Sequence, residues 1–495
     1  MRLRWITALT FAGLLYGCGD SATTEQATPT ADSTRNEPAA IDTAASAPPA
    51  SAFTVDFDYH TLDNGLKVIL SQDHTAPVVT VAVYYNIGFR IEPRDRTGFA
   101  HLFEHMMFQG SENLGKMEFI SLVNANGGVL NGSTRFDYTN YFEIVPAHKL
   151  ETMLWAEADR MRGLNITDEN LANQQGVVKN EVKVNVLNQP YGGFPWLWLP
   201  QYANENWYNS HNFYGDLEDL DAASLADVAD FFSRYYAPNN AALAIVGDFD
   251  SAEALAMVEK YFADIPASAE PIVLPDISEP RQEAEKTESM TDALATRPGF
   301  AFAYHVPERL TPEWYAMGLI DQILLQGDDS LLHQALVQEA GITDGISGGI
   351  NALLGTMLNY KGPILWSASF IHDSSTSQEQ ILQVVDGVIE QFKAAAIDQA
   401  LLDRALVKWR SDYYEQVSST FGFGRADLLA SLALFDNNPG LINEFEKGMQ
   451  MVTPELIQKT AQEYLRSSNR TTLELVAGAA TAAQTSAAQG EQDNG

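Results

Sequence analysis

The sequence predicts an α+β fold in which two related halves follow one another along the chain. About 440 residues follow a polar amino-terminal stretch, which is too many for one ordinary core and enough for two. Segments rich in Val, Ile and aromatic residues, which favour strands, alternate with segments of helical pattern. Weak internal similarity indicates a duplication: residues 235–247 resemble 463–478, and 300–306 take the place of 81–86.

The first 18 residues have the pattern of a secretory signal peptide. Arg2 and Arg4 precede an apolar run from Trp5 to Tyr16, which is too short to span a bilayer as a stable helix. The chain's single cysteine, Cys18, stands in a context that resembles the lipobox of bacterial lipoproteins. That resemblance implies export, lipidation of Cys18 and an anchor on the periplasmic side of a bacterial membrane. The alternative is an ordinary cysteine within a signal peptide.

Composition divides the remainder of the chain. Residues 19–52 hold almost no large apolar residue, so we expect a disordered tether there. We place a first domain at 53–271, a polar linker at 272–297 and a second domain at 298–480, before a disordered tail at 481–495. The net charge of −35 argues against nucleic acid as a partner, because it would repel phosphates. It favours basic or unfolded peptides, although solubility alone would also explain it.

The first half is expected to mix strands and helices along its length. An Asn-Gly turn leads into the first strand, and glycines close the helix that precedes residue 127. The expected strands span 66–70, 78–86, 128–134, 138–145 and 240–246, and the expected helices span 98–108, 118–126, 150–162, 224–236 and 251–262. In the second half a strand at 300–306 precedes a helix at 314–325, which takes the place of the helix at 98–108.

The helix expected at 98–108 carries His101, Glu104 and His105. Histidines four residues apart project from one helical face, where they can bind one zinc ion at about 2.0–2.1 Å. A carboxylate beside them can accept a proton from a water on that metal. The order His-x-x-Glu-His is the inverted form of the zinc-protease helix. A histidine pair alone is more often structural, so the glutamate and the apolar neighbours support the metal interpretation.

A catalytic zinc site also needs a third protein ligand and an open position. Glu181, 76 residues after His105 in an Asn-Glu context, is the candidate. With this spacing the chain resembles the M16, or pitrilysin-type, metallopeptidases. The resemblance implies zinc on His101, His105 and Glu181, with Glu104 as the general base of peptide hydrolysis. It also implies two homologous domains, each a mainly antiparallel sheet flanked by helices, of which only the first holds metal. Taken alone, Glu181 could be a solvated charge.

The resemblance also implies where substrate binds and where this chain departs from the family. Asn131 and Gly132 take the place of an Asn-Ala pair on an edge strand that pairs with extended peptides. An ordinary bulged strand is the alternative. Gln174 replaces a second glutamate that stands seven residues before the third ligand in many members. Residues 330–332 and 341–344 lack the Arg and Tyr that hold substrate in many members. We therefore expect a homologous M16 subunit to supply both, which makes this chain the zinc-bearing half of a heterodimer.

An aromatic-rich run, two other classes of function and the remaining histidines leave alternatives open. The aromatic-rich run from Gln189 to Gly215 could line a subsite for peptide side chains or, as is more common, pack as a wall; its end, 211–215, resembles a His-Pro-Tyr-Gly element without the proline. A peptidase-like binding or assembly subunit would usually have lost metal ligands. A structural zinc site would need four ligands, commonly cysteines, and Cys18 is the only one. We interpret the remaining histidines as surface or core residues: His60, His74, His148, His211, His305, His333 and His372.

Overall fold

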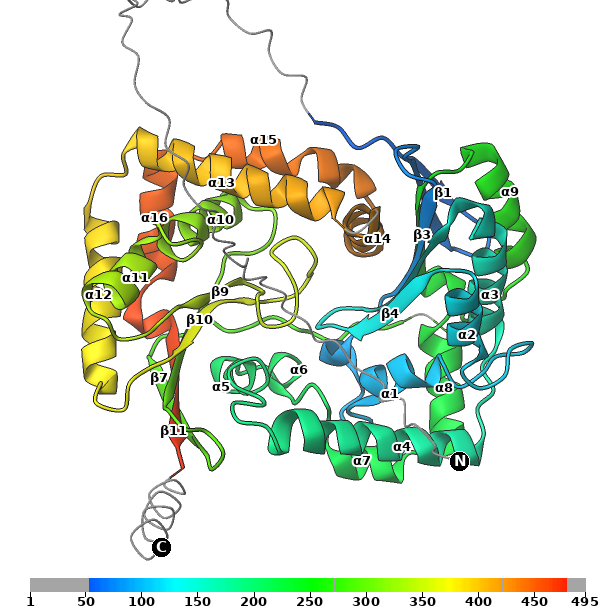
Figure 1. Cartoon of the computed structure of the whole chain (residues 1–495), viewed down its shortest axis with the longest axis horizontal. Helices are drawn as coiled ribbons and strands as arrows, with labels where there is room; N and C mark the ends of the chain where they lie inside the picture. Colours follow the sequence, from blue (N-terminus) through cyan, green and yellow to red (C-terminus); the bar gives the residue numbers. More distant parts are fainter. Residues whose placement is uncertain (1–52, 271, 420–421, 479–495) are drawn as a thin grey trace, which may run out of the picture. The chain divides into compact units, whose positions relative to one another are not determined.

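The computed structural model describes residues 53–270, 272–419 and 422–478. The predictions on the signal peptide, Cys18, the tether and the tail at 481–495 lie outside the described residues. The described chain contains two sheets, each with helices packed on it (Figure 1). Among the described residues no helix is both long and apolar enough to cross a membrane.

The first sheet has six strands in the order β1-β2-β6-β3-β5-β4. All neighbouring strands run antiparallel except β2 and β6, which are parallel. The strands are β1 (Asp58–Thr61), β2 (Lys67–Gln72), β3 (Val78–Tyr85), β4 (Val129–Thr134), β5 (Thr139–Pro146) and β6 (Ala241–Gly247). The helices of this half are α1 (Phe99–Met106), α2 (Glu118–Ala125), α3 (Leu150–Arg162), α4 (Asp168–Val182), α5 (Leu199–Ala203), α6 (Trp207–Ser210), α7 (Leu217–Ala222), α8 (Leu225–Tyr235) and α9 (Ser251–Phe262).

The second sheet has five strands in the order β7-β11-β8-β10-β9, and only β7 and β11 are parallel. The strands are β7 (Lys286–Asp292), β8 (Gly299–His305), β9 (Ser347–Ile350), β10 (Leu365–Ile371) and β11 (Arg470–Ala477). The helices are α10 (Pro312–Leu324), α11 (Leu331–His333), α12 (Gln378–Ala394), α13 (Gln399–Ser418), α14 (Phe423–Asp436), α15 (Phe445–Gln450) and α16 (Pro454–Tyr464).

The two sheets correspond strand by strand, which confirms the predicted duplication of an α+β unit. Strands β2, β6, β3, β5 and β4 match β7, β11, β8, β10 and β9 in order, and α10 follows β8 as α1 follows β3. The correspondence extends to side chains. The Asn240 amide donates to the carbonyl of Tyr235, and the Asn469 amide donates to the carbonyl of Tyr464, each just before the matching strand.

One part of the predicted linker is a strand instead. Residues 286–292, within the stretch 272–297, form β7 at the edge of the second sheet. Most of its side chains are exposed, and its sequence contains one large apolar residue, Met290. A strand exposed on both faces shows no alternation of apolar and polar residues, so its sequence resembles that of a polar loop.

Each half covers a sheet face of the other half. Helix α14 of the second half packs on β3 and β6 of the first sheet, and it is seen end-on beside β3 in Figure 1. Inside this contact the Tyr84 hydroxyl donates to the buried Asp427 carboxylate at 2.7 Å. In return, a segment of the first half packs on the second sheet through Phe194, Leu199 and Ala203. Each half therefore depends on the other to cover one face of its sheet.

Asp321 on α10 is a buried carboxyl with a testable effect on stability. It accepts a hydrogen bond from the Trp366 indole at 2.6 Å, and burial raises its pKa to about 7. Its pKa in the unfolded chain is about 3.9, so between about pH 4 and pH 7 the folded protein holds this proton more tightly. Its contribution to the free energy of unfolding therefore falls as pH rises, by on the order of 4 kcal/mol.

The measurement is urea unfolding of the wild type and Asp321→Asn from pH 4 to pH 8. Both proteins share all other titrating groups, so their difference isolates Asp321. We expect the stability of the wild type to fall relative to the variant as pH rises. Parallel pH profiles for the two proteins would contradict this assignment.

Candidate metal centre

A buried glutamate, Glu92, caps the N-terminus of helix α1. The N-cap, Gly98, has a left-handed backbone (φ 79°) and no side chain to cap the helix. Instead, the carboxylate of Glu92 accepts the N–H of Gly98 at 2.9 Å and the N–H of Ala100. These bonds satisfy two free donors and place negative charge at the positive end of the helix dipole. Apolar residues of α1 are buried in the first core: Phe99, Leu102, Phe103 and Met106.

The structure brings His101, His105 and Glu181 together, from α1 and α4. The two Nε2 atoms are 3.4 Å apart, and His105 Nε2 lies 3.2 Å from Glu181 Oε2. His101 Nε2 lies 3.7 Å from Glu181 Oε1. Four tetrahedral ligands at about 2.0–2.1 Å from a zinc ion are about 3.3 Å from one another. These three side chains, the one group of potential metal ligands of this kind in the described chain, therefore have the spacing of a zinc site.

The pKa shifts of His101 and Glu181 also suit a cation, whereas that of His105 reflects its bond to Glu181. Burial lowers the pKa of His101, which favours the neutral ring that a metal requires. Burial opposes the charged form of His105 as well, but its hydrogen bond to Glu181 and the nearby carboxylates raise its pKa overall. Burial also opposes ionisation of Glu181, yet the two histidines hold the pKa of Glu181 below its usual value. Glu181 is therefore an anion facing two imidazoles.

Glu104 lies beside this group, against strand β4. The Thr134 hydroxyl at the end of β4 donates to Glu104 Oε2 at 2.8 Å, which fixes the carboxylate. A β-carbon added at Gly132 would lie 3.4 Å from Glu104 Cγ, so the strand passes directly over this side chain. Thr134 bonds one oxygen of Glu104, and no hydrogen bond from the described residues reaches the other.

Strand β4 is an edge strand, as expected for the segment that carries Asn131 and Gly132. It pairs only with β5 in the described chain, with Asn131 opposite Phe142 and Gly132 opposite Tyr141. The Gly132 N–H donates to the Asn131 side-chain oxygen at 2.9 Å, so this donor points to the open edge and not into the sheet. A free edge whose outward N–H bonds only the neighbouring Asn131 side chain can accept an added strand.

One residue near the ligands, Gln174, differs from the glutamate that many M16 members have. The buried Gln174 donates its side-chain amide to the Asn173 side-chain oxygen at 2.8 Å and places a neutral group where those members have a charge. His101 Nδ1 has no hydrogen-bond partner among the described residues. The rings of Phe213 and Tyr214 pack against His101 instead, at 5.2 and 5.1 Å between centroids.

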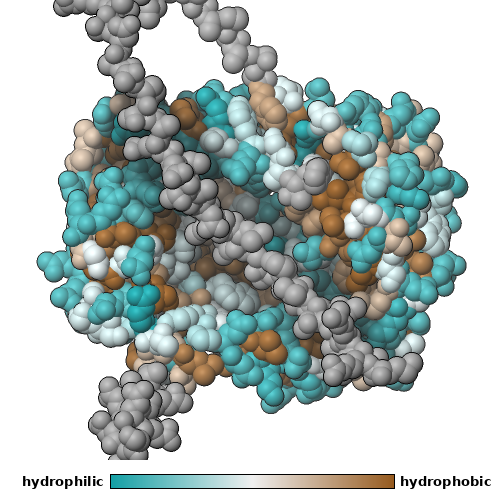
Figure 2. Space-filling model, viewed as in Figure 1, coloured by the Kyte–Doolittle hydropathy of each residue, from teal (hydrophilic) through white to brown (hydrophobic). Residues whose placement is uncertain are grey.

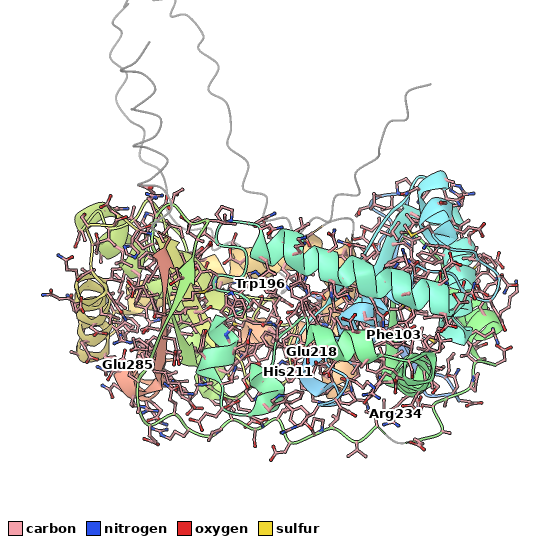
Figure 3. All side chains as sticks on the ribbon, turned by 90° about the horizontal axis from the view of Figure 1, so that it is seen from below. Phe103, Trp196, His211, Glu218, Arg234 and Glu285 are labelled. Atoms are coloured by element: carbon pink, nitrogen blue, oxygen red, sulfur yellow. The ribbon has the colours of Figure 1, made fainter. Side chains whose placement is uncertain are left out.

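Part of the aromatic-rich run packs as a wall, and another part lies against the candidate metal ligands. Its first part packs as a wall on the second sheet, with Phe194 buried there. Its last part reaches the metal centre, where the Trp196 ring contacts Phe213 and Tyr214. In the view of Figure 3, Trp196 and His211 lie between Phe103 on one side and Glu285 on the other. His211 is not a metal ligand; its ring stacks on Trp207 at 4.2 Å and lies 3.6 Å from Glu92.

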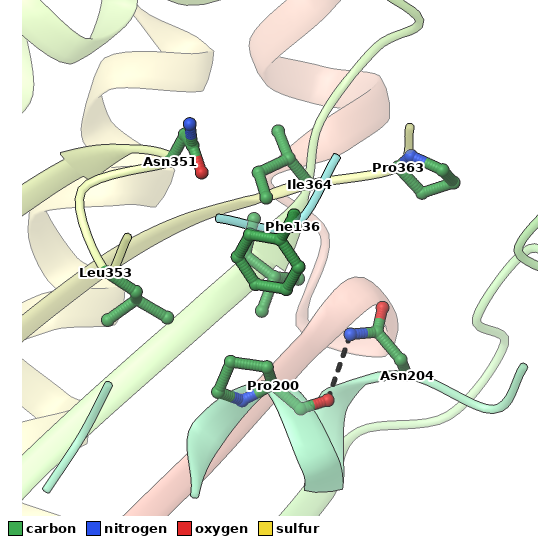
Figure 4. Close-up of a pocket in the computed structure, with 8 residues that line it drawn as sticks. Phe136, Pro200, Asn204, Asn351, Leu353, Pro363 and Ile364 are labelled. Atoms are coloured by element: carbon green, nitrogen blue, oxygen red, sulfur yellow. Dashed lines mark hydrogen bonds between the residues drawn. The ribbon is translucent and has the colours of Figure 1, made fainter. Parts of the chain in front are cut away.

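Two cavities of the described chain lie away from the candidate metal ligands. A small cavity between the halves has room for little more than one water molecule (Figure 4), and the Asn204 amide at its wall donates to the Pro200 carbonyl at 2.9 Å. A groove of about 520 Å³ is lined by Tyr191, Arg297 and residues of β9 and β10. Residues 330–332 and 341–344 of the second half contribute no Arg or Tyr, and Asp344 lies 3.5 Å from Arg297 in this groove.

Three residues at the centre had no role assigned from the sequence: Glu92, Thr134 and Tyr214. Glu92 caps α1, Thr134 holds Glu104, and the Tyr214 hydroxyl donates to Glu181 Oε1 at 3.3 Å. An acidic residue shortly before a helix is a recognisable capping signal. Tyr214 lies in the stretch 211–215 that resembles a family element. Its contact with Glu181, like that of Thr134 with Glu104, joins distant segments and has no comparable signal in one sequence.

Comparison with known proteins gives two matches to family models. The model described as insulinase (peptidase family M16) matches residues 67–191, which include His101, Glu104, His105 and Glu181. The model described as peptidase M16 inactive domain matches residues 222–407.

Individual relatives and solved structures agree with these matches. The zinc protease PqqE of Helicobacter pylori is 26% identical over 418 residues, which are 83% of this chain and 91% of that protein. A crystal structure of a protease from Helicobacter pylori superposes with a TM-score of 0.77 at 24% identity, covering 85% of this chain and all of that one. The periplasmic protease PqqL from Escherichia coli has a TM-score of 0.68 at 18% identity, with 88% of this chain and 49% of that one covered.

Proposed function

Because the chain belongs to the M16 family of peptidases, we propose that it is a zinc-dependent endopeptidase that cleaves extended peptides or unfolded segments. The observation that carries this proposal is the convergence of His101, His105 and Glu181, with Glu104 beside them. A binding subunit without turnover would not need this complete set. The relatives named zinc proteases support the same activity and the same metal.

The proposed chemistry assigns each residue one task. His101, His105 and Glu181 would hold one zinc ion and leave a coordination position open. The bound ion supplies Lewis acidity, which makes a water molecule more acidic and polarises a carbonyl group. Glu104 accepts the proton of the attacking water and later passes it to the leaving amine. Thr134 keeps one oxygen of Glu104 occupied, so that the other faces the water.

The proposed substrate position is the open edge of β4. An extended peptide that adds to this edge would lie over Gly132, next to Glu104. Such pairing uses main-chain hydrogen bonds and therefore demands little of the substrate sequence. The face of the described chain in Figure 2 is largely hydrophilic, and the sequence has 65 acidic against 30 basic residues. This charge favours basic peptides through long-range attraction.

Asn131→Ala tests the substrate position. The side-chain oxygen of Asn131 accepts a hydrogen bond from the edge N–H of Gly132. When a peptide binds, the Asn131 side chain can give up this bond and contact the substrate backbone instead. Loss of one such hydrogen bond is worth about 0.5–1.5 kcal/mol, so we expect kcat/KM to fall by about 3–10-fold while bound zinc stays constant. The matched control is Asn124→Ala on the exposed surface of α2, which should leave kcat/KM unchanged. Equal kinetics for both variants would remove Asn131 from the substrate site.

We further propose that a homologous M16 subunit completes the enzyme. The second half provides no Arg or Tyr at 330–332 and 341–344, where many members of the family have them. Supporting this, the second half matches a family model described as inactive. The test is hydrolysis of a quenched basic peptide by the purified single chain. Full activity without any partner would contradict the heterodimer and leave the peptidase assignment intact.

The proposed location is the periplasmic side of a bacterial membrane. The signal-like first 18 residues and the position of Cys18 support export and lipid anchoring. The similar Escherichia coli protein is named a periplasmic protease. Cys18→Ser should release the protein from the membrane fraction of cells that express the full chain. Retention of the variant in that fraction would contradict the lipid anchor.

A further inference from the structure

The candidate metal ligands come from two helices that must be held at a fixed separation. His101 and His105 lie on α1, whereas Glu181 lies near the end of α4. A glutamate side chain has several rotatable bonds, and its carboxylate binds metal well only if neighbouring groups hold it in place. The side chain of Tyr214 contacts ligands from both helices.

The phenol of Tyr214 contacts Glu181 on α4 and His101 on α1. Its hydroxyl donates to Glu181 Oε1 at 3.3 Å, and its ring packs edge-on against His101 at 5.1 Å between centroids. Tyr214 is buried, and its hydroxyl is the donor in this bond because the ionised Glu181 carboxylate can only accept. The hydroxyl has no other hydrogen-bond partner in the described chain, and it makes no hydrogen bond to Glu104.

The backbone of Tyr214 is fixed to the start of α1. Gly98 and Gly215 both have left-handed backbones, with φ of 79° and 67°. A β-carbon at Gly98 would lie 2.4 Å from the Tyr214 carbonyl oxygen, and one at Gly215 would lie 2.2 Å from the Gly98 nitrogen. The Asp216 N–H also donates to the Thr97 hydroxyl at 2.8 Å. The backbone around Tyr214 and the N-terminus of α1 therefore form one close contact that only glycines permit.

From this arrangement we propose that Tyr214 is a positioning residue for the third metal ligand. Its backbone is anchored to α1 and its hydroxyl holds the carboxylate on α4, so it sets the geometry between the two helices. This inference rests on the proposed zinc site. It assigns to Tyr214 no contact with substrate.

Tyr214→Phe removes the hydroxyl and keeps the ring that packs on His101. Loss of a group that orients a metal ligand typically weakens metal binding by about 10–100-fold, and we expect that loss here. The measurement is the zinc dissociation constant of the full chain, by competition with a chromophoric chelator at fixed pH. The control is Tyr413→Phe in the second half, where another buried tyrosine donates to the Ile442 carbonyl. The control should keep the zinc affinity of the wild type.

A double-mutant cycle shows whether Tyr214 acts through Glu181. In a Glu181→Ala background the acceptor is gone, so Tyr214→Phe should cause no further loss of zinc affinity. An equal loss in both backgrounds would overturn the proposal, as would an unchanged affinity in the single variant. A Tyr214→Phe protein with normal zinc affinity but a lower kcat would instead place the hydroxyl on the substrate, which also overturns it.

The proposed function and the positioning role of Tyr214 can be refuted separately. If the wild type binds zinc but never hydrolyses peptides, the proposed function is wrong while the zinc affinities still test Tyr214. If the wild type hydrolyses peptides and Tyr214→Phe binds zinc equally well, only the positioning role is wrong. Thermal unfolding of the metal-free variants gives the purely structural effect of each lost hydroxyl.

Discussion

Glu104→Gln is expected to abolish measurable peptide hydrolysis while zinc stays bound. The amide cannot accept the proton of the attacking water, and a positioned general base contributes about 10²–10⁴-fold to a rate. Glutamine keeps the shape of the side chain and can still accept the hydrogen bond of Thr134, so the helix and the ligands should be undisturbed. Hydrolysis of a quenched peptide and the zinc content of the same sample are the two measurements.

The control for this variant is Glu169→Gln, an exposed residue in the first turn of α4. It removes the same charge from the same half of the chain without touching the centre, so activity should remain. Loss of zinc in Glu104→Gln would show that the residue supports the ligands and is not the base. Retained hydrolysis in that variant would remove Glu104 from the reaction.

Glu181→Gln is expected to weaken zinc binding strongly and with it all activity. Structural zinc sites with four ligands bind with about 10–16 kcal/mol, so one ligand accounts for about 10²–10³-fold in affinity. The neutral amide also removes the anion that lies 3.2 Å from His105, so the pKa of His105 should fall. Zinc affinity by chelator competition is the measurement, with Glu169→Gln again as the control. Full zinc occupancy in Glu181→Gln at low free zinc would refute the third-ligand assignment.

Much of the fold and of the centre could be predicted because local patterns determine them. His101 and His105 share a helical face by spacing alone, and the β-branched and aromatic residues of β3 and β5 favour strands there. Glu181 needed the family spacing as well, because a single carboxylate on a helix has no distinguishing pattern. The edge position of β4 likewise came from the resemblance, and the strand order confirms it.

The parts of the fold and of the centre that could not be predicted depend on contacts between distant segments. Helix α14 is rich in Ala, Leu and Phe, which indicates that it is buried, but not that it covers the sheet of the other half. Strand β7 is polar because both of its faces are exposed, so its sequence resembles a linker. Tyr214 meets Glu181 because Gly98 and Gly215 permit a close backbone contact, and this depends on geometry that only the folded chain provides.

The most direct test of the central claim is the metal content of the purified chain. The measurement is zinc per chain by mass spectrometry, for the wild type and for His101→Ala, prepared in parallel at low free zinc. The proposed centre predicts about one zinc ion per wild-type chain, since its three ligands form one four-coordinate site with an open position. It predicts loss of that ion in the variant. A wild-type chain without zinc, or equal zinc in both proteins, would contradict the metal centre and the peptidase built on it.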